Sequence, residues 1–208
     1  MSRDRLRLLL DRAAFPLLAF LTTKQARRLH LTPLDHERVE ACLPYCSGLI
    51  LDVGCGPNEL VRRHGRGVGV DVYPWPQIHI LCDTRRLPFP DASFDTAALL
   101  AVLNHVPQRD REAVLNDIHR VLRPGGRLLV TMLDPVIGRI THRLRFRQDP
   151  DQHERGMLAE EDYGLWGSEV RVLLEESGFR VERRRRFVFG LNNLYVAARA
   201  APLGHALR

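Results

Sequence analysis

Two glycines follow an apolar run that carries an acid near its end. The run Leu49–Val53 contains Asp52, and Gly54-Cys55-Gly56 comes directly after it. Glycine lets a backbone approach a ligand that a side chain would keep away. Asp71 ends the next apolar run, where an acid can accept hydrogen bonds from both hydroxyls of a ribose. The spacing therefore predicts a site for a nucleoside-containing ligand.

The charge around this turn separates two kinds of nucleoside ligand. A nicotinamide-dinucleotide fingerprint needs a third glycine where this chain has Glu59, and it seats a pyrophosphate on a helix N-terminus. Asp52 and Glu59 flank the turn, and like charges a few ångströms apart cost on the order of 1 kcal/mol each even when well screened. A ligand with an ammonium and a sulfonium is favoured, because both groups are cations. The local charge indicates S-adenosylmethionine.

Candidate catalytic residues come later in the chain. Methyl transfer from a sulfonium is an in-line displacement, in which the protein positions the nucleophile and can supply a base. His105 follows the fourth apolar run and is the best candidate for lining the reaction centre, with loop bracing as the alternative role. His153 is a second candidate, in a stretch of residues 134–166 without a clear pattern. Other side chains there that could contact an acceptor, or lie on the surface or in the core, are His142, Met157, Tyr163 and Trp166.

The elements that must position these residues alternate between short apolar runs and helical patterns. This alternation is typical of a parallel sheet covered on both faces, which binds ligands at the carboxyl ends of its strands. The last two strands are close enough to pair as an antiparallel hairpin. The expected strands are Leu49–Val53, Gly67–Val72, Ile78–Cys82, Phe94–Leu100, Arg127–Leu133, Phe179–Val188 and Leu194–Arg199. The expected helices are 32–43, 59–64, 110–122 and one between the caps Ser168 and Gly178, with loops at Pro124-Gly125-Gly126, Gly190 and Asn192-Asn193.

One connection is too short for a crossover helix. Only about a dozen residues, including Pro74 and Pro76, separate Asp71 from Asp83, and a full crossover helix needs more. We expect this side of the site to be open. The N-terminal residues 1–47 could close it as a helical lid.

Composition leaves the partner open. The net charge is +6, which permits an anionic partner such as nucleic acid, a phosphorylated metabolite or a lipid headgroup without requiring one. The longest basic block is Arg183–Arg186, and alternate residues of a strand face opposite sides, so nucleic acid is not favoured. The four cysteines form no CxxC pair, which predicts reduced thiols and no metal site. No apolar run reaches the roughly 18 residues of a transmembrane helix, although residues 3–21 could contact a membrane surface.

The segment Leu49–Leu133 resembles the class I methyltransferases, specifically the group that methylates small molecules. The resemblance implies a Rossmann-like three-layer α/β sandwich. Its sheet would be mostly parallel with seven strands in the order 3-2-1-4-5-7-6, the last one antiparallel. The matching pieces are Leu51-Asp52-Val53-Gly54-Cys55-Gly56, Gly69-Val70-Asp71, Leu87-Pro88-Phe89 with Ser93-Phe94-Asp95, and His119-Arg120-Val121-Leu122-Arg123-Pro124-Gly125-Gly126.

The resemblance also implies roles for single residues. Asp52 and the glycines would hold the methionine end of the cofactor, with Asp52 near the ammonium, and Asp71 would bind the ribose. Asp83 would accept from the adenine amino group, unless it only caps its loop, and Thr84 would lie against the ring. The backbone at Ala101 would meet the methionine moiety. The expected cofactor contacts are Asp52, Gly54, Cys55, Gly56, Asp71, Val72, Asp83, Thr84 and Ala101.

The sequence therefore predicts a cytoplasmic S-adenosylmethionine-dependent methyltransferase with a small-molecule acceptor. Residues 48–208 would form the cofactor-binding domain, with acceptor contacts in about 134–166. The Asn-Pro-Pro-aromatic signature of base-amine methylation is absent, because the equivalent position reads Ala101-Val102-Leu103-Asn104. Two alternatives stay open: an RNA or protein methyltransferase that uses the basic surface, and a non-catalytic S-adenosylmethionine-binding protein.

Overall fold

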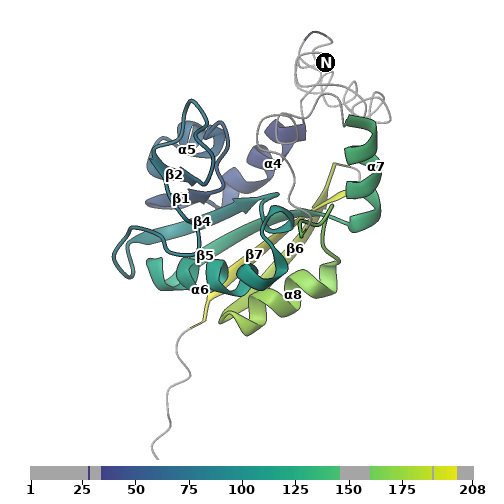
Figure 1. Ribbon diagram of the computed structural model, residues 1–208. Helices are drawn as coiled ribbons and strands as arrows, with labels where there is room; N and C mark the ends of the chain where they lie inside the picture. Colours follow the sequence, from purple (N-terminus) through teal and green to yellow (C-terminus); the bar gives the residue numbers. More distant parts are fainter. Residues whose placement is uncertain (1–27, 29–33, 146–159, 189, 201–208) are drawn as a thin grey trace, which may run out of the picture.

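A seven-stranded sheet lies between two layers of helices in the computed structural model (Figure 1). The structure describes residue 28 and residues 34–145, 160–188 and 190–200. The strand order is β3-β2-β1-β4-β5-β7-β6, as predicted. Strand β7 is antiparallel to both β5 and β6, and the other pairs are parallel, which confirms the expected antiparallel last strand.

The elements have the following bounds. The strands are β1 Ile50–Val53, β2 Gly67–Asp71, β3 Ile80–Leu81, β4 Phe94–Leu100, β5 Leu122–Leu133, β6 Phe179–Phe187 and β7 Asn192–Arg199. The α-helices are α4 Leu34–Cys42, α5 Glu59–His64, α6 Arg111–Val121, α7 Pro135–Arg145 and α8 Gly167–Glu176. Short 3₁₀ turns are η1 Leu43–Tyr45, η2 Leu103–His105 and η3 Gln108–Asp110.

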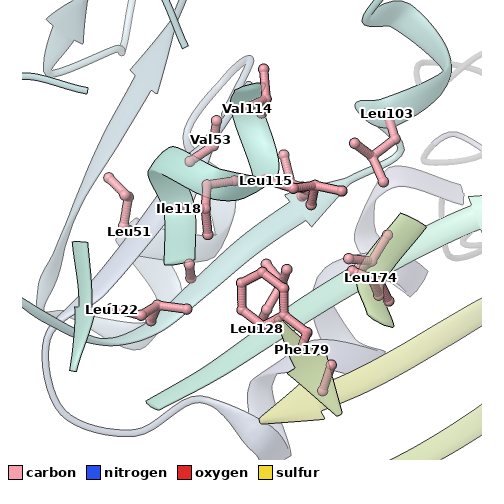
Figure 2. Packing of buried hydrophobic residues seen from close by; sticks show 14 of the residues in the cluster. Leu51, Val53, Leu103, Val114, Leu115, Ile118, Leu122, Leu128, Leu174 and Phe179 are labelled. Carbon is pink, nitrogen blue, oxygen red and sulfur yellow. The ribbon is translucent and has the colours of Figure 1, made fainter. Parts of the chain in front are cut away.

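Alternation along the central strand builds a core on each face of the sheet. In β1, Leu51 and Val53 pack with α6 and α8 on one face, and Figure 2 shows Leu115 and Ile118 of α6 in this cluster. Ile50 points to the other face, where it packs with buried residues of α4 and α5. Because side chains alternate between the faces of a strand, a strand buried on both sides is apolar throughout, with Asp52 as the exception in β1.

The connection between β2 and β3 contains no helix, as its length predicted. A side-chain contact holds the two strands at this place instead. Asn58, just before α5, donates from Nδ2 to the backbone oxygen of Gln77 at 3.0 Å, and its amide lies 3.2 Å from Nε2 of His79. The backbone N–H of Gly69 donates to Nδ1 of His79 at 3.3 Å. The edge of the sheet at β2 and β3 is therefore not covered by a crossover helix.

Several boundaries differ from the prediction. Strand β5 begins at Leu122 and runs through Pro124-Gly125-Gly126, with a register irregularity opposite β4 between Phe94 and Thr96. Asn192 and Asn193, predicted as loop residues, lie in β7 and are each 1% exposed. Helix α8 has Trp166 rather than Ser168 as its N-cap, and Ser177 rather than Gly178 as its C-cap.

Part of the predicted lid is a helix that packs on the sheet. Within residues 1–47 the structure describes α4 and η1, and Val39 and Cys42 of α4 are buried in the second core. Residues 1–27 and 29–33, which include Thr32 and the possible membrane contact at 3–21, lie outside the described residues. In the described part of the chain, no helix combines the length and apolarity that crossing a bilayer needs.

Candidate functional site

The glycine turn is bonded to the neighbouring strand. The N–H groups of Gly54 and Cys55 both donate to the backbone oxygen of Val70 in β2, at 2.9 and 3.1 Å. Gly54 and Gly56 have φ values of 69° and 49°, the left-handed region that favours glycine. A Cβ atom placed on Gly56 would meet nothing within 4 Å, so open space adjoins this backbone. Cys55 is 8% exposed, and burial raises the pKa of its thiol.

Asp71 lies at the end of β2 and faces this turn. One carboxylate oxygen accepts from the N–H of Gly56 at 2.9 Å, and the other accepts from the N–H of Tyr73 at 3.0 Å. The residue is 6% exposed, so its position is well defined. A carboxylate offers about four lone-pair sites, so each oxygen can accept one further hydrogen bond, for example from a hydroxyl.

Asp52 is a buried carboxyl group. It is 2% exposed, and its Oδ1 has no hydrogen-bond partner among the described residues. Burial, and then the charge of Asp71, raise the pKa of Asp52 to about 8. A cation beside this carboxylate would reverse both effects, since it would replace the lost solvation and oppose the repulsion. The pair of acids therefore fits the ammonium and ribose hydroxyls of S-adenosylmethionine.

The side expected to hold adenine is apolar and open. Val72 follows Asp71 and is 54% exposed, and Leu81, which pairs with Asp71 across β2 and β3, is 57% exposed. Leu81 was missed from the sequence, because only the strand register places it beside Asp71. Thr84 is buried, whereas the Asp83 carboxylate accepts from the side chain of Arg85 at 2.8 to 3.1 Å, which lowers the pKa of Asp83, and its Oδ1 also accepts from the backbone N–H of Arg85 at 2.9 Å. This loop-capping contact was the alternative role for Asp83, and its adenine contact stays a prediction.

The end of β4 lies against the glycine turn. Ala101 has a φ of 58°, a strained value for a residue with a side chain, and its N–H donates to the oxygen of Thr131. The next residue, Val102, packs on Gly54: a Cβ at Gly54 would lie 2.6 Å from Cγ2 of Val102. The N–H of His105 donates to the oxygen of Val102 at 2.8 Å. His105 is therefore one turn of chain away from the predicted methionine end.

His105 contacts an acid that the sequence did not single out. Its Nδ1 lies 3.0 Å from Oε2 of Glu161, which comes from the segment before α8. Of the other acceptor-side candidates, Tyr163 and Trp166 are exposed, and Arg139 of α7 lies over the Tyr163 ring. His142 lies in α7, but its side chain is outside the described part. His153 and Met157 also lie outside the described residues.

Comparison with known proteins gives one family and several relatives. Residues 51–130 match the family model described as "Methyltransferase domain". The chain is 34% identical over 115 residues to 27-O-demethylrifamycin SV methyltransferase of Amycolatopsis mediterranei, covering 44% of this chain and 41% of the relative. It is 30% identical over 94 residues to probable tRNA methyltransferase 9B of Mus musculus, covering 39% of this chain and 21% of the relative. The chain thus spans less than half of either relative.

A solved structure shares the fold over nearly the whole chain. It is the 1,6-didemethyltoxoflavin-N1-methyltransferase of Burkholderia thailandensis, with bound 1,6-didemethyltoxoflavin and S-adenosylhomocysteine. The match has a TM-score of 0.60 at 18% identity and covers 97% of this chain and 91% of the other. At this identity the likeness shows the fold.

Proposed function

From the premise that the chain belongs to the class I S-adenosylmethionine-dependent methyltransferases, we propose that it transfers the methyl group of S-adenosylmethionine to a small-molecule acceptor. S-adenosylmethionine is the cofactor of this family. The names of the relatives point to different classes of acceptor, 27-O-demethylrifamycin SV in one case and tRNA in the other. The relatives therefore leave the acceptor class open.

The observation that carries the proposal is the pair of carboxylates beside the glycine turn. Asp52 is buried with an oxygen that lacks a hydrogen-bond partner among the described residues, and Asp71 lies against the N–H of Gly56. A pyrophosphate would be repelled by the Asp71 carboxylate and would oppose ionisation of Asp52, whereas an ammonium or a sulfonium would be attracted and would favour the ionised form of Asp52. The open space beside Gly56 leaves room for a ligand next to the protein backbone. The electrostatics support S-adenosylmethionine over a dinucleotide.

The residues of this chain would bind and orient the reactants. Asp52 would lie near the ammonium, Asp71 would accept from the ribose hydroxyls, and Val72 with Leu81 would contact the adenine ring. When bound, S-adenosylmethionine supplies an activated methyl group on a sulfonium. The protein then has to hold an acceptor in line with that methyl group, since orientation provides much of the rate acceleration in displacements of this kind. The turn that carries His105 is hydrogen-bonded to Val102, which packs on Gly54, so His105 would lie on the acceptor side.

Calorimetry on the full chain tests the proposal. We expect S-adenosylmethionine and S-adenosylhomocysteine to bind without added metal, and NAD not to bind. The variant Asp71→Ala leaves ligand hydroxyls unpaired and should weaken cofactor binding by about 2–4 kcal/mol. Glu176→Ala, on the exposed end of α8, is the matched control and should bind as the wild type does. Preferential binding of NAD, or unchanged affinity in a folded Asp71→Ala variant, would contradict the proposal.

A second candidate acceptor is RNA, favoured by one feature of the sheet edge. Arg183–Arg186 lie on β6, the last strand of the sheet, and all are exposed. Among the described residues, none of these four arginines has a carboxylate within ion-pair distance. Charged residues also protect sheet edges from association, which explains the block without a ligand. An RNA acceptor would show affinity that falls steeply with salt, and a variant in which Arg183 and Arg185 become Ala would reduce that slope by about two.

A further inference from the structure

Glu161 and His105 form a pair whose carboxylate is shielded from water. The Glu161 side chain is 0% exposed and that of His105 is 25% exposed, with Oε2 and Nδ1 3.0 Å apart. A carboxylate accepts hydrogen bonds, so the imidazole donates from Nδ1. The hydrogen bond at one ring nitrogen sets the tautomer of a neutral histidine. In the neutral imidazole, the Nδ1–H would therefore point to Glu161 and the lone pair would lie on Nε2.

Flanking contacts fix Glu161 relative to His105. The neighbours of Glu161 are also acids: Glu160 pairs with Arg109 and Asp162 pairs with Arg111. The Arg111 guanidinium lies in the interior and donates from Nε to two backbone oxygens of the His105 turn, those of Leu103 and Val106, at 3.1 and 3.0 Å. The three successive acids at 160–162 thus all pair with side chains of the segment 105–111.

A backbone hydrogen bond adds to these ion pairs. The N–H of Asp162 donates to the oxygen of Asn104 at 2.8 Å. Because backbone and side chains on both sides of Glu161 are tied to the same turn, the carboxylate cannot shift without breaking several hydrogen bonds. The arrangement is typical of a carboxylate that orients an imidazole rather than of a surface ion pair.

The imidazole lies close to the cofactor turn along the chain. The His105 N–H bonds to Val102, and Val102 packs directly on Gly54. We infer that His105 is the general base for a hydroxyl acceptor, that Glu161 is its positioning residue, and that the reaction is O-methylation. This inference rests on the proposed function and names the acceptor class of the same site.

The chemistry of methyl acceptors explains the choice of class. A hydroxyl is a weak nucleophile until its proton is removed, so a positioned base accelerates its attack. A neutral amine attacks through its lone pair and can lose its proton to water afterwards. In the inferred step, an acceptor oxygen forms a bond to the methyl carbon while the carbon–sulfur bond breaks and its electron pair stays on sulfur. The hydroxyl proton passes to Nε2 of His105, and the imidazolium that results is stabilised by Glu161.

The tautomer can be measured without any acceptor. Nitrogen-15 NMR of the imidazole side chains should show His105 protonated at Nδ1 in the wild type and in the control Glu176→Gln. Glu161→Ala should lose this preference. Calorimetry with S-adenosylhomocysteine on the same samples shows whether each variant is folded and binds ligand. A wild-type His105 protonated at Nε2 in a protein that binds S-adenosylhomocysteine would overturn the inference and leave the proposed function standing.

The acceptor class is read from the product. Wild-type protein with S-adenosylmethionine labelled at the methyl carbon is incubated with a mixture of hydroxylated, amino and enolisable small molecules. We expect carbon-13 signals of methoxy groups, which are well separated from those of N-methyl and C-methyl groups. Products methylated only on nitrogen or carbon, or no product from a protein that binds S-adenosylhomocysteine, would refute O-methylation. A protein that does not bind S-adenosylhomocysteine would refute the proposed function itself.

Kinetics on the best hydroxylated acceptor separates positioning from structure. His105→Gln should reduce kcat by about 100-fold or more, and Glu161→Gln by about 10-fold or more, with KM changed by less than about twofold. Glu161→Gln keeps the volume of the side chain, so a fold defect would appear in cofactor binding. If Glu161→Gln instead raised KM and weakened S-adenosylhomocysteine binding by as much as it lowered kcat, Glu161 would only support the fold.

Discussion

At the scale of single residues, local spacing predicted the cofactor side and missed the contacts that depend on tertiary structure. Gly54, Gly56 and Asp71 could be named from the sequence, because a turn and the next strand end bring them together in any parallel sheet of this kind. Leu81 is placed by strand register and Glu161 by a chain segment far from His105. No periodicity in the sequence indicates either contact.

The free space beside Gly56 leads to a prediction about the glycine itself. Gly56 and Gly125 both have a left-handed φ, 49° and 77°, and a Cβ on either would meet nothing within 4 Å. Gly56→Ala and Gly125→Ala should each cost about 1–2 kcal/mol of stability through the strained backbone alone. Only Gly56→Ala should also weaken S-adenosylhomocysteine binding, by about tenfold or more, because its methyl group occupies ligand space.

The comparison uses denaturation for stability and calorimetry for affinity. Gly125 lies in β5 between Leu122 and the central part of the strand, away from the glycine turn, and so serves as the matched control. If both variants bind the ligand equally well after their stability is accounted for, the space beside Gly56 is not part of the binding site.

At the scale of elements, Asn58 holds the β2–β3 connection, which contains no crossover helix. A crossover helix normally covers strands of a parallel sheet and buries their apolar side chains. Here Asn58 is 4% exposed and has a φ of 56°, and Gly69 makes room for it, since a Cβ there would lie 2.1 Å from Oδ1 of Asn58. A polar side chain thus replaces several apolar ones.

Removal of the Asn58 side chain should therefore destabilise the protein. Asn58→Ala loses the hydrogen bond to Gln77 and leaves a non-glycine residue in left-handed backbone, so we expect a loss of about 2–3 kcal/mol in the free energy of unfolding. Asn116→Ala, on the exposed face of α6, should change it by less than about 0.5 kcal/mol. Urea denaturation of both variants makes the test, and equal stabilities would show that the connection does not depend on Asn58.

Element boundaries failed where tertiary contacts override local preference. The segment of α7 was predicted as part of a stretch without a clear pattern, residues 134–166, whereas the structure has a helix there that contains Gly138. The structure explains this glycine: a Cβ there would lie 1.7 Å from the backbone oxygen of Tyr163, so close packing requires it. Asn193 was predicted as a loop residue, yet its Oδ1 accepts from Arg184 at 2.9 Å and keeps the residue buried in β7. Neither contact can be read from nearby sequence.

At the scale of the whole molecule, the pattern along the chain predicted a parallel sheet with a terminal hairpin, and the resemblance to the class I methyltransferases supplied the strand order that the structure has. Strands alternating with helices leave few ways to build a parallel sheet with right-handed connections, and the short hairpin at the end adds β6 and β7. The same order brings the carboxyl ends of β1, β2 and β4 together. The position of the proposed cofactor site is therefore a consequence of the fold, whereas the acceptor contacts after β5 stay a prediction.

The buried Asp52 couples the stability of the whole molecule to pH. Its pKa is raised from 3.8 to about 8 in the folded protein, so the folded state binds more protons than the unfolded state between these values. Stability from this group is fully present below pH 3.8 and falls as pH rises, by about 1.4 kcal/mol per pH unit, until about pH 8. His119, whose pKa is lowered by burial, acts in the opposite direction at mildly acidic pH.

The difference between wild type and Asp52→Asn isolates the effect of Asp52. Between about pH 5 and about pH 8 the wild type should lose stability relative to Asp52→Asn, because the asparagine does not ionise and His119 contributes equally to both. S-adenosylhomocysteine should reduce the loss in the wild type only, since its ammonium stabilises the ionised carboxylate, and its affinity should rise with pH over the same range. Chemical denaturation at several pH values, with and without ligand, gives all four curves. Parallel curves for the two proteins would show that the Asp52 carboxyl is ionised throughout, and a ligand effect independent of pH would place the ammonium away from it.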